Sequence, residues 1–190
     1  WAGWSVVPGW GWVEWAFIGA SAVLHVVYFI VLLRGYRKAD LTVVYPLARG
    51  SGPLLSSFVA ITLLGEQLSW LGALGIAGVV GGVFLIAGGP ALLRATHDPA
   101  ARARVHAGMG YGLLTGAFIA AYTVVDGYAV KVLLMSPILV DYMGNFVRVA
   151  VLAPTVLRDL PTARSLWVVQ WRFALLVAVV SPVAYVLVLF

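Results

Sequence analysis

Six long apolar stretches alternate with short polar connections along the chain, and each is long enough to cross a bilayer as a helix. A hydrocarbon core about 30 Å thick needs about 20 helical residues. The predicted spans are, in order, Trp15–Leu33, Leu41–Leu64, Trp70–Gly88, Met109–Val130, Ile138–Leu157 and Phe173–Phe190. With 63% hydrophobic and only 10% charged residues, the chain cannot present an ordinary soluble surface. The pattern therefore predicts an all-α membrane protein, a polytopic bundle of transmembrane helices.

Polar residues inside five of these spans recur at helical spacing, so that those of one span share one helix face. A charge facing lipid at mid-bilayer costs about 2.5–3.5 kcal/mol, so we expect these faces to point inward, toward protein or water. The stripes are Ser21, His25 and Tyr28; Tyr45, Arg49, Gly52 and Ser56; Tyr111, Thr115, Tyr122 and Asp126; Asp141, Asn145 and Arg148; and Ser181 and Tyr185. Together they predict a polar cavity between helices, which is typical of transporters.

The third span differs because no side chain between Trp70 and Gly88 is charged or hydrogen-bonding. Its glycines form a ridge of small residues, the kind that lets helix backbones approach closely. Gly78 and Gly82 make a GxxxG pair, and Gly75 belongs to the same ridge. We expect this helix to pack tightly against another helix, either in the same chain or in a homodimer formed through Trp70–Gly88.

The second span carries the most informative segment, in which two prolines and two glycines surround Arg49. Proline lacks an N–H and clashes with the preceding turn, so it frees helical carbonyls. Such backbone is tolerated in a membrane where it meets protein or a wet cavity, and transporters use it for binding and hinges. The predicted hinge residues are Pro46, Gly50, Gly52 and Pro53. The alternative is an arginine that extends to the headgroups from a kinked helix.

Each of the other polar candidates has a functional and a structural interpretation. Arg148 either meets substrate or neutralises Asp126 or Asp141. Asp126 either carries a proton during transport or lies solvated or salt-bridged near a helix end. His25 is either a protonation switch, level with Arg49 in depth, or a neutral core histidine. Four tyrosines either stack on substrate or pack: Tyr28, Tyr45, Tyr122 and Tyr185.

The net charge of +5 reflects basic connections rather than a nucleic-acid surface. Nine basic residues lie in alternate connections, and only Lys131 lies in a connection on the opposite side. Positive residues in short loops mark the cytoplasmic side of a membrane. The nine are Arg34, Arg37, Lys38, Arg94, Arg102, Arg104, Arg158, Arg164 and Arg172. The expected partners are therefore the lipid bilayer and a small-molecule substrate, with no nucleic acid.

Catalytic chemistry has no candidate constellation in this sequence. The chain has no cysteine, its three histidines are scattered, and no hydrolase, nucleotide-binding or zinc-protease motif occurs. We therefore expect neither an enzyme nor a metal or cofactor site, and the alternative of another class is an integral-membrane lipid-modifying enzyme. Because the chain opens at Trp1 without methionine and stops at Phe190 within a helix, we expect it to be part of a longer protein.

Three motifs carry a resemblance to a known family. They are the run Tyr45-Pro-Leu-Ala-Arg-Gly50, the turn Leu64-Gly-Glu-Gln-Leu-Ser69 with its following glycine-rich helix, and Ala121-Tyr-Thr-Val-Val-Asp-Gly127. In these the chain resembles an EamA-type member of the drug/metabolite transporter superfamily. The resemblance implies ten helices in two inverted five-helix repeats, of which this chain holds about the third to the eighth.

On that resemblance, residues 1–88 end the first repeat, 89–107 form a basic linker, and 108–190 begin the second repeat. It implies an integral, multi-pass protein of a bacterial inner membrane. Relatives keep both termini in the cytoplasm, which would place the basic connections outside. The charges of this chain favour the reverse orientation.

The expected function is secondary transport of a small polar or amphipathic metabolite by alternating access, in the direction of efflux. The arginines favour an anionic or carboxylate-bearing substrate over a cation. The alternative is multidrug efflux of organic cations, for which such pumps centre on a mid-helix glutamate. Glu14 and Glu66 both lie at helix ends, so that role would fall to Asp126.

Overall fold

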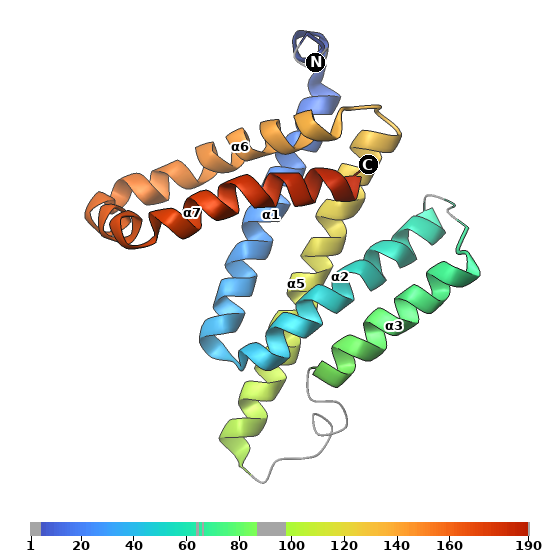
Figure 1. Ribbon diagram of the computed structural model, residues 1–190, viewed down its shortest axis with the longest axis vertical. Helices are drawn as coiled ribbons and strands as arrows, with labels where there is room; N and C mark the ends of the chain where they lie inside the picture. Colours follow the sequence, from blue (N-terminus) through green and yellow to red (C-terminus); the bar gives the residue numbers. More distant parts are fainter. Residues whose placement is uncertain (1–4, 64, 66, 87–97, 190) are drawn as a thin grey trace. The chain divides into compact units, whose positions relative to one another are not determined.

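The computed structural model describes residues 5–63, 65, 67–86 and 98–189, and every regular element in these ranges is helical (Figure 1). A short 3-10 turn, η1 (Val7–Gly9), precedes the first long helix. The α-helices are α1 (Trp12–Lys38), α2 (Leu41–Leu63), α3 (Trp70–Ile86), α5 (Pro99–Lys131), α6 (Pro137–Arg158) and α7 (Leu160–Leu189). The prediction of an all-α membrane protein is confirmed.

All six predicted spans are helices, but they are not equally suited to cross a membrane. Four helices of the described chain are long and apolar enough to do so: α1, α5, α6 and the part of α7 from Leu160 to Ala184. The described part of α3 is shorter, 17 residues, because it ends at Ile86. Helix α2 is long enough but is not one of these four; it contains Arg49, two prolines, and several glycines and serines.

Two helices begin well before their predicted starts. Helix α5 starts at Pro99 instead of Met109, and α7 starts at Leu160 instead of Phe173. The charge pattern predicts loops for these stretches, but alanine, leucine and arginine are strong helix formers. Each start also has an aspartate that accepts a backbone N–H bond: Asp98 from Ala100 at 2.9 Å, and Asp159 from Thr162 at 3.2 Å.

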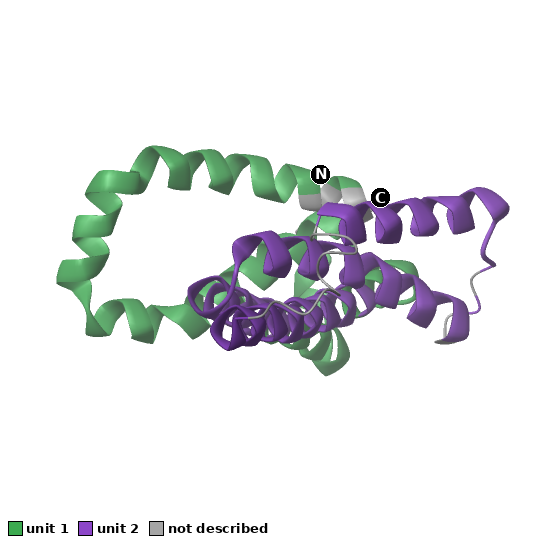
Figure 2. Cartoon of the chain, turned by 90° about the horizontal axis from the view of Figure 1, so that it is seen from below, with its two compact units in different colours: residues 1–23, 125–190 green, residues 24–124 purple. Residues whose placement is uncertain are grey.

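The chain forms two compact units, coloured separately in Figure 2. One contains residues 1–23 and 125–190, and the other contains residues 24–124. We call them the terminal unit and the central unit. Helices α1 and α5 each contribute a segment to both. The division into repeats expected from the sequence, with its linker at 89–107, stays a prediction.

The core of the central unit is built from α1, α2 and α5. Its buried residues are Tyr28, Leu32, Val44, Ala48 and Ile119, with the rings of Tyr36, Tyr111, Phe118 and Tyr122 packed against them. Helix α3 packs on α2 after the intervening turn, and the two lie side by side in Figure 1. Most of the described surface of α3 is exposed, and none of its residues is buried.

Close helix packing in the central unit depends on glycines of α5. Gly108, Gly112 and Gly116 recur every fourth residue and face α2. A Cβ at Gly112 would lie 2.8 Å from the Cβ of Leu47 and 3.1 Å from the carbonyl oxygen of Val44. A Cβ at Gly116 would collide with the hydroxyl of Ser51. We call these three residues the glycine seam.

The predicted ridge on α3 has no such role in the described chain. A Cβ added at Gly75, Gly78 or Gly82 would meet nothing within 4 Å. Contact with α2 instead runs through the side chain of Val83, which lies against Gly50. Helix α3 therefore packs on α2 without using this ridge among the described residues, and packing by the ridge itself, in this chain or in a homodimer, stays a prediction.

The terminal unit has its own core, formed by α1, α5 and α6. Ile18, Ala129, Met135, Val140 and Met143 are buried there. The rings of Phe17 and Tyr128 stack beside it, with centroids 5.2 Å apart and planes inclined by 12°. Helix α7 contributes no buried residue along its apolar stretch, so nearly all of its described surface is open to lipid or another helix.

Candidate functional site

Three ring side chains meet between α1 and α5 in the central unit. The imidazole of His25 stacks on the ring of Tyr122, with centroids 3.8 Å apart and planes inclined by 27°. The ring of Tyr28 lies edge-on to His25 at 5.9 Å and tilted toward Tyr122 at 5.4 Å. Only 5% of His25 and 7% of Tyr28 is exposed. We call these three residues the aromatic cluster.

The cluster forms because polar residues share a face on each of its two helices. On α1, His25 and Tyr28 lie one turn apart, and Ser21 precedes them by another turn with 3% exposure. On α5, Thr115 is fully buried and its hydroxyl donates to the carbonyl of Tyr111 at 2.7 Å. The prediction that the polar faces of these helices point inward is confirmed at these positions.

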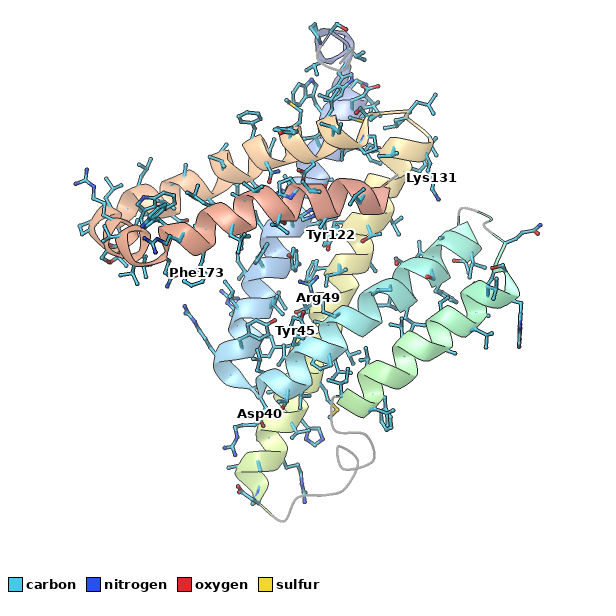
Figure 3. The ribbon with its side chains drawn as sticks, viewed as in Figure 1. Asp40, Tyr45, Arg49, Tyr122, Lys131 and Phe173 are labelled. Atoms are coloured by element: carbon cyan, nitrogen blue, oxygen red, sulfur yellow. The ribbon has the colours of Figure 1, made fainter. Side chains whose placement is uncertain are left out.

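Helix α2 presents a second polar group at its surface, formed by Tyr45 and Arg49. The guanidinium carbon of Arg49 lies 5.7 Å from the centroid of the Tyr45 ring, within the range of a cation–π interaction. The two residues follow one another along the helix in Figure 3. The hydroxyl of Tyr36 on α1 interacts electrostatically with the charge of Arg49. We call Tyr36, Tyr45 and Arg49 the arginine site.

The arginine site differs from expectation in its exposure. Half of Tyr45 is exposed and Arg49 is also exposed, whereas Gly52 of the same predicted stripe is buried against Ile119. Helix α2 uses its small residues to approach α5, whereas Arg49 lies at an exposed position of the same helix. Among the described residues Tyr45 and Arg49 meet no burying helix face, so their predicted place along a substrate pathway stays a prediction.

The predicted hinge is a continuous helix in this structure, since α2 runs through both Pro46 and Pro53. Pro53 has no N–H to donate to the carbonyl of Arg49, so this carbonyl lacks its usual helical donor. Two serine hydroxyls donate to carbonyls of the same helix: Ser51 to Leu47 at 2.6 Å, and Ser56 to Pro53 at 3.1 Å. The helix is weakened at the arginine without being broken.

The remaining charged candidates belong to the terminal unit. Asp126 of α5 is 1% exposed. On α6, Asp141 is 4% exposed and accepts a bond from the amide of Asn145 at 3.2 Å. A nitrogen of Arg148 lies 3.7 Å from the other oxygen of Asp141. Of the two partners expected for Arg148, the structure pairs it with Asp141, which lies on its own helix.

Several predicted site residues stay apart or undescribed. Ser56 lies about two turns from Arg49 and bonds its own helix. Tyr185 lies in α7, and its side chain is outside the described residues. Tyr36 was not predicted as a site residue, although its position two turns after Tyr28 places it near the same face of α1. Among the described residues, no group of histidine, aspartate and glutamate could hold a metal ion.

Comparison with known proteins adds no identification. No protein-family profile matches the chain, and neither a curated protein nor a solved structure matches it. What the fold and these sites define is an integral-membrane helical protein that buries polar and ionisable groups between its helices.

Proposed function

We propose that this protein is a secondary transporter that exports a small polar or amphipathic metabolite by alternating access. The observation that carries the proposal is the aromatic cluster, in which an ionisable His25 and two tyrosines are packed between apolar helices. Placing polar or ionisable side chains inside the bilayer costs free energy, and such residues usually mark substrate or ion pathways. A protein that only had to fold in lipid would fill this position with apolar side chains.

The arginine site supports an anionic substrate. A guanidinium presents a planar fork that matches a carboxylate, and Tyr45 holds it by its ring face without using its donors. The weakened helix around Pro53 gives α2 the freedom to move this fork during transport. Export of organic cations is the second candidate, favoured by the buried carboxylate of Asp126.

Uptake into proteoliposomes tests the proposal and separates the two substrate classes. Radiolabelled short carboxylates, neutral amides and organic cations would be compared with and without a pH gradient. We expect carboxylate flux above that of protein-free vesicles. Replacement of Arg49 by lysine keeps the charge but removes the fork, so flux should fall about tenfold or more with normal membrane insertion.

The matched control is Arg104→Lys, at an exposed arginine of α5 outside both sites, which should transport normally. Wild-type flux in Arg49→Lys would show that Arg49 does not bind substrate and only extends toward the lipid headgroups. Flux of cations alone would favour the second candidate, and absence of flux for every class would contradict transport itself.

A further inference from the structure

The beginning of α7 carries basic and aromatic side chains on one exposed face. Arg164 and Arg172 are exposed, and Trp167 and Trp171 are 56% and 42% exposed. Counted from Arg164, the other three follow at i+3, i+7 and i+8, a spacing that places all four on one side of the helix. We call these four residues the arginine–tryptophan face. All of them are open to molecules outside the chain.

The length of α7 places this face near the lipid headgroups. A helix of 30 residues is about 45 Å long, whereas the hydrocarbon core of a bilayer is about 30 Å thick. From Phe173, labelled in Figure 3, to Leu189 no side chain is charged, and both arginines of the face precede Phe173. The uncharged part of α7 therefore suits the core, and the arginine–tryptophan face lies at its edge.

The guanidinium of Arg172 is held in a way that leaves its donors available. Its central carbon lies 5.4 Å from the centroid of the Trp171 ring, within the range of a cation–π interaction. Such a contact needs no hydrogen-bond acceptor, so the N–H groups of the guanidinium can still bond an anion. Their planar fork matches the oxygens of a phosphate.

Positive charge at this end of α7 is only weakly compensated. Arg158, at the end of α6, adds a third exposed cation. Between Tyr142 and Phe190 the sequence has one acidic residue, Asp159. Its carboxylate accepts the backbone N–H of Thr162 at 3.2 Å and so caps the start of α7. The balance of charge here favours an anionic partner.

We propose that the arginine–tryptophan face binds the headgroup of an anionic phospholipid. The phosphate accepts from Arg172, while Arg164, about two turns away, adds positive charge. Trp167 and Trp171 lie at the boundary between headgroups and acyl chains, the level that indole rings prefer. Val168 shares this face and is 72% exposed, so it can contact an acyl chain. The proposal does not rest on transport by this protein.

Charge and apolar surface together identify the ligand class. A zwitterionic phospholipid carries its own cation beside the phosphate, which would be repelled by the arginines. A soluble phosphate would gain nothing from the exposed tryptophans and Val168, whereas a lipid buries apolar surface against them. An anionic phospholipid satisfies both requirements.

Binding of a fluorescent phosphatidylglycerol, labelled on its acyl chain, to the purified protein in neutral detergent tests the site by fluorescence anisotropy. We expect unlabelled phosphatidylglycerol to displace the probe about tenfold more effectively than phosphatidylcholine with the same acyl chains. Glycerol 3-phosphate, the soluble headgroup without chains, should not displace it at the same concentration.

Arg172→Gln should weaken binding of the probe about tenfold, because it removes the charged fork. Arg172→Lys, which keeps the charge, should weaken it less. The matched control is Arg104→Gln, which changes the net charge equally at an exposed position of α5 and should stay within about twofold of the unmodified protein. Circular dichroism checks that each variant is folded.

Three results would overturn the proposal. Equal displacement by phosphatidylcholine and phosphatidylglycerol would mean that α7 meets lipids without headgroup selectivity. Equal losses in Arg172→Gln and Arg104→Gln would mean that the probe responds only to net charge. Displacement by glycerol 3-phosphate as effective as that by phosphatidylglycerol would mean that the site takes a soluble phosphate rather than a lipid.

Discussion

Single residues in this protein combine packing with ionisable chemistry, and His25 is the clearest case. Its imidazole is almost fully buried, and its stack on Tyr122 is the closest ring pair described in the central unit. Such ring pairs contribute about 0.5–1.5 kcal/mol beyond the area they bury. A neutral ring could supply the packing equally well, so packing and protonation can be separated by substitution.

Replacing His25 by phenylalanine should leave stability nearly unchanged, because a flat ring still fills the space against Tyr122. Replacing it by alanine should lower the free energy of unfolding by about 2 kcal/mol or more, because it leaves a cavity between α1 and α5. Thermal unfolding in detergent measures both. Equal losses in the two variants would show that the imidazole's polar bonds, rather than its packing, stabilise the fold.

At the scale of elements, the glycine seam decides how closely α2 approaches α5. Backbone atoms of Val44 and Ala48 lie within 3.5 Å of a Cβ placed at Gly112, so no side-chain movement can relieve the crowding. By contrast, Gly110 of the same helix is exposed and a Cβ there would meet nothing within 4 Å. The two positions form a natural pair for comparison.

Gly112→Ala should therefore destabilise the protein by about 1–3 kcal/mol, the usual cost of overpacking. Gly110→Ala should be neutral or slightly stabilising, since alanine is the better helix former by up to about 1 kcal/mol. Unfolding of both variants in the same detergent provides the measurement. A tolerated alanine at Gly112 would mean that α2 and α5 lie farther apart than described.

The glycines of α3 give the opposite expectation. Because a Cβ at Gly78 would meet nothing within 4 Å, Gly78→Leu should leave the unfolding temperature of the monomer unchanged. If copies of the chain associate through Trp70–Gly88, the same substitution should weaken the dimer in sedimentation experiments. A monomer destabilised by Gly78→Leu would reveal packing against residues outside the described part of the chain.

At the scale of the whole molecule, the distribution of basic residues predicts the orientation in the membrane. Lys38 and Ala103 stand at exposed positions near the ends of α1 and α5, and Gln67 is exposed in the turn between α2 and α3. Because the chain has no cysteine, single cysteines can be introduced without background.

Cysteines at Lys38 or Ala103 should react with impermeant thiol reagents only after the inner face of the membrane is opened. A cysteine at Gln67 should react from outside in intact cells. This pattern follows from the retention of positive loops in the cytoplasm. The reverse pattern would agree with the orientation that the family resemblance implies.

The sequence by itself determined the class of fold and most of the helices. The length of the apolar stretches and the scarcity of charge within them are local properties, and α2, α3 and α6 begin within a residue of their predicted starts. The periodic polar faces of α1 and α5 were also readable, because helical geometry alone places residues four apart on one side.

Only the tertiary structure decided which of these faces have partners. The glycines of α5 and α3 look alike in sequence, but the glycine seam of α5 lies against α2, whereas a Cβ at Gly75, Gly78 or Gly82 would meet nothing within 4 Å in the described chain. The same holds for the polar residues. His25 is buried because Tyr122 of α5 stacks on it, whereas Arg49, on an equally regular stripe, is exposed. The spacing of residues in the sequence determines which of them share a helix face, but only tertiary packing determines which neighbour that face contacts.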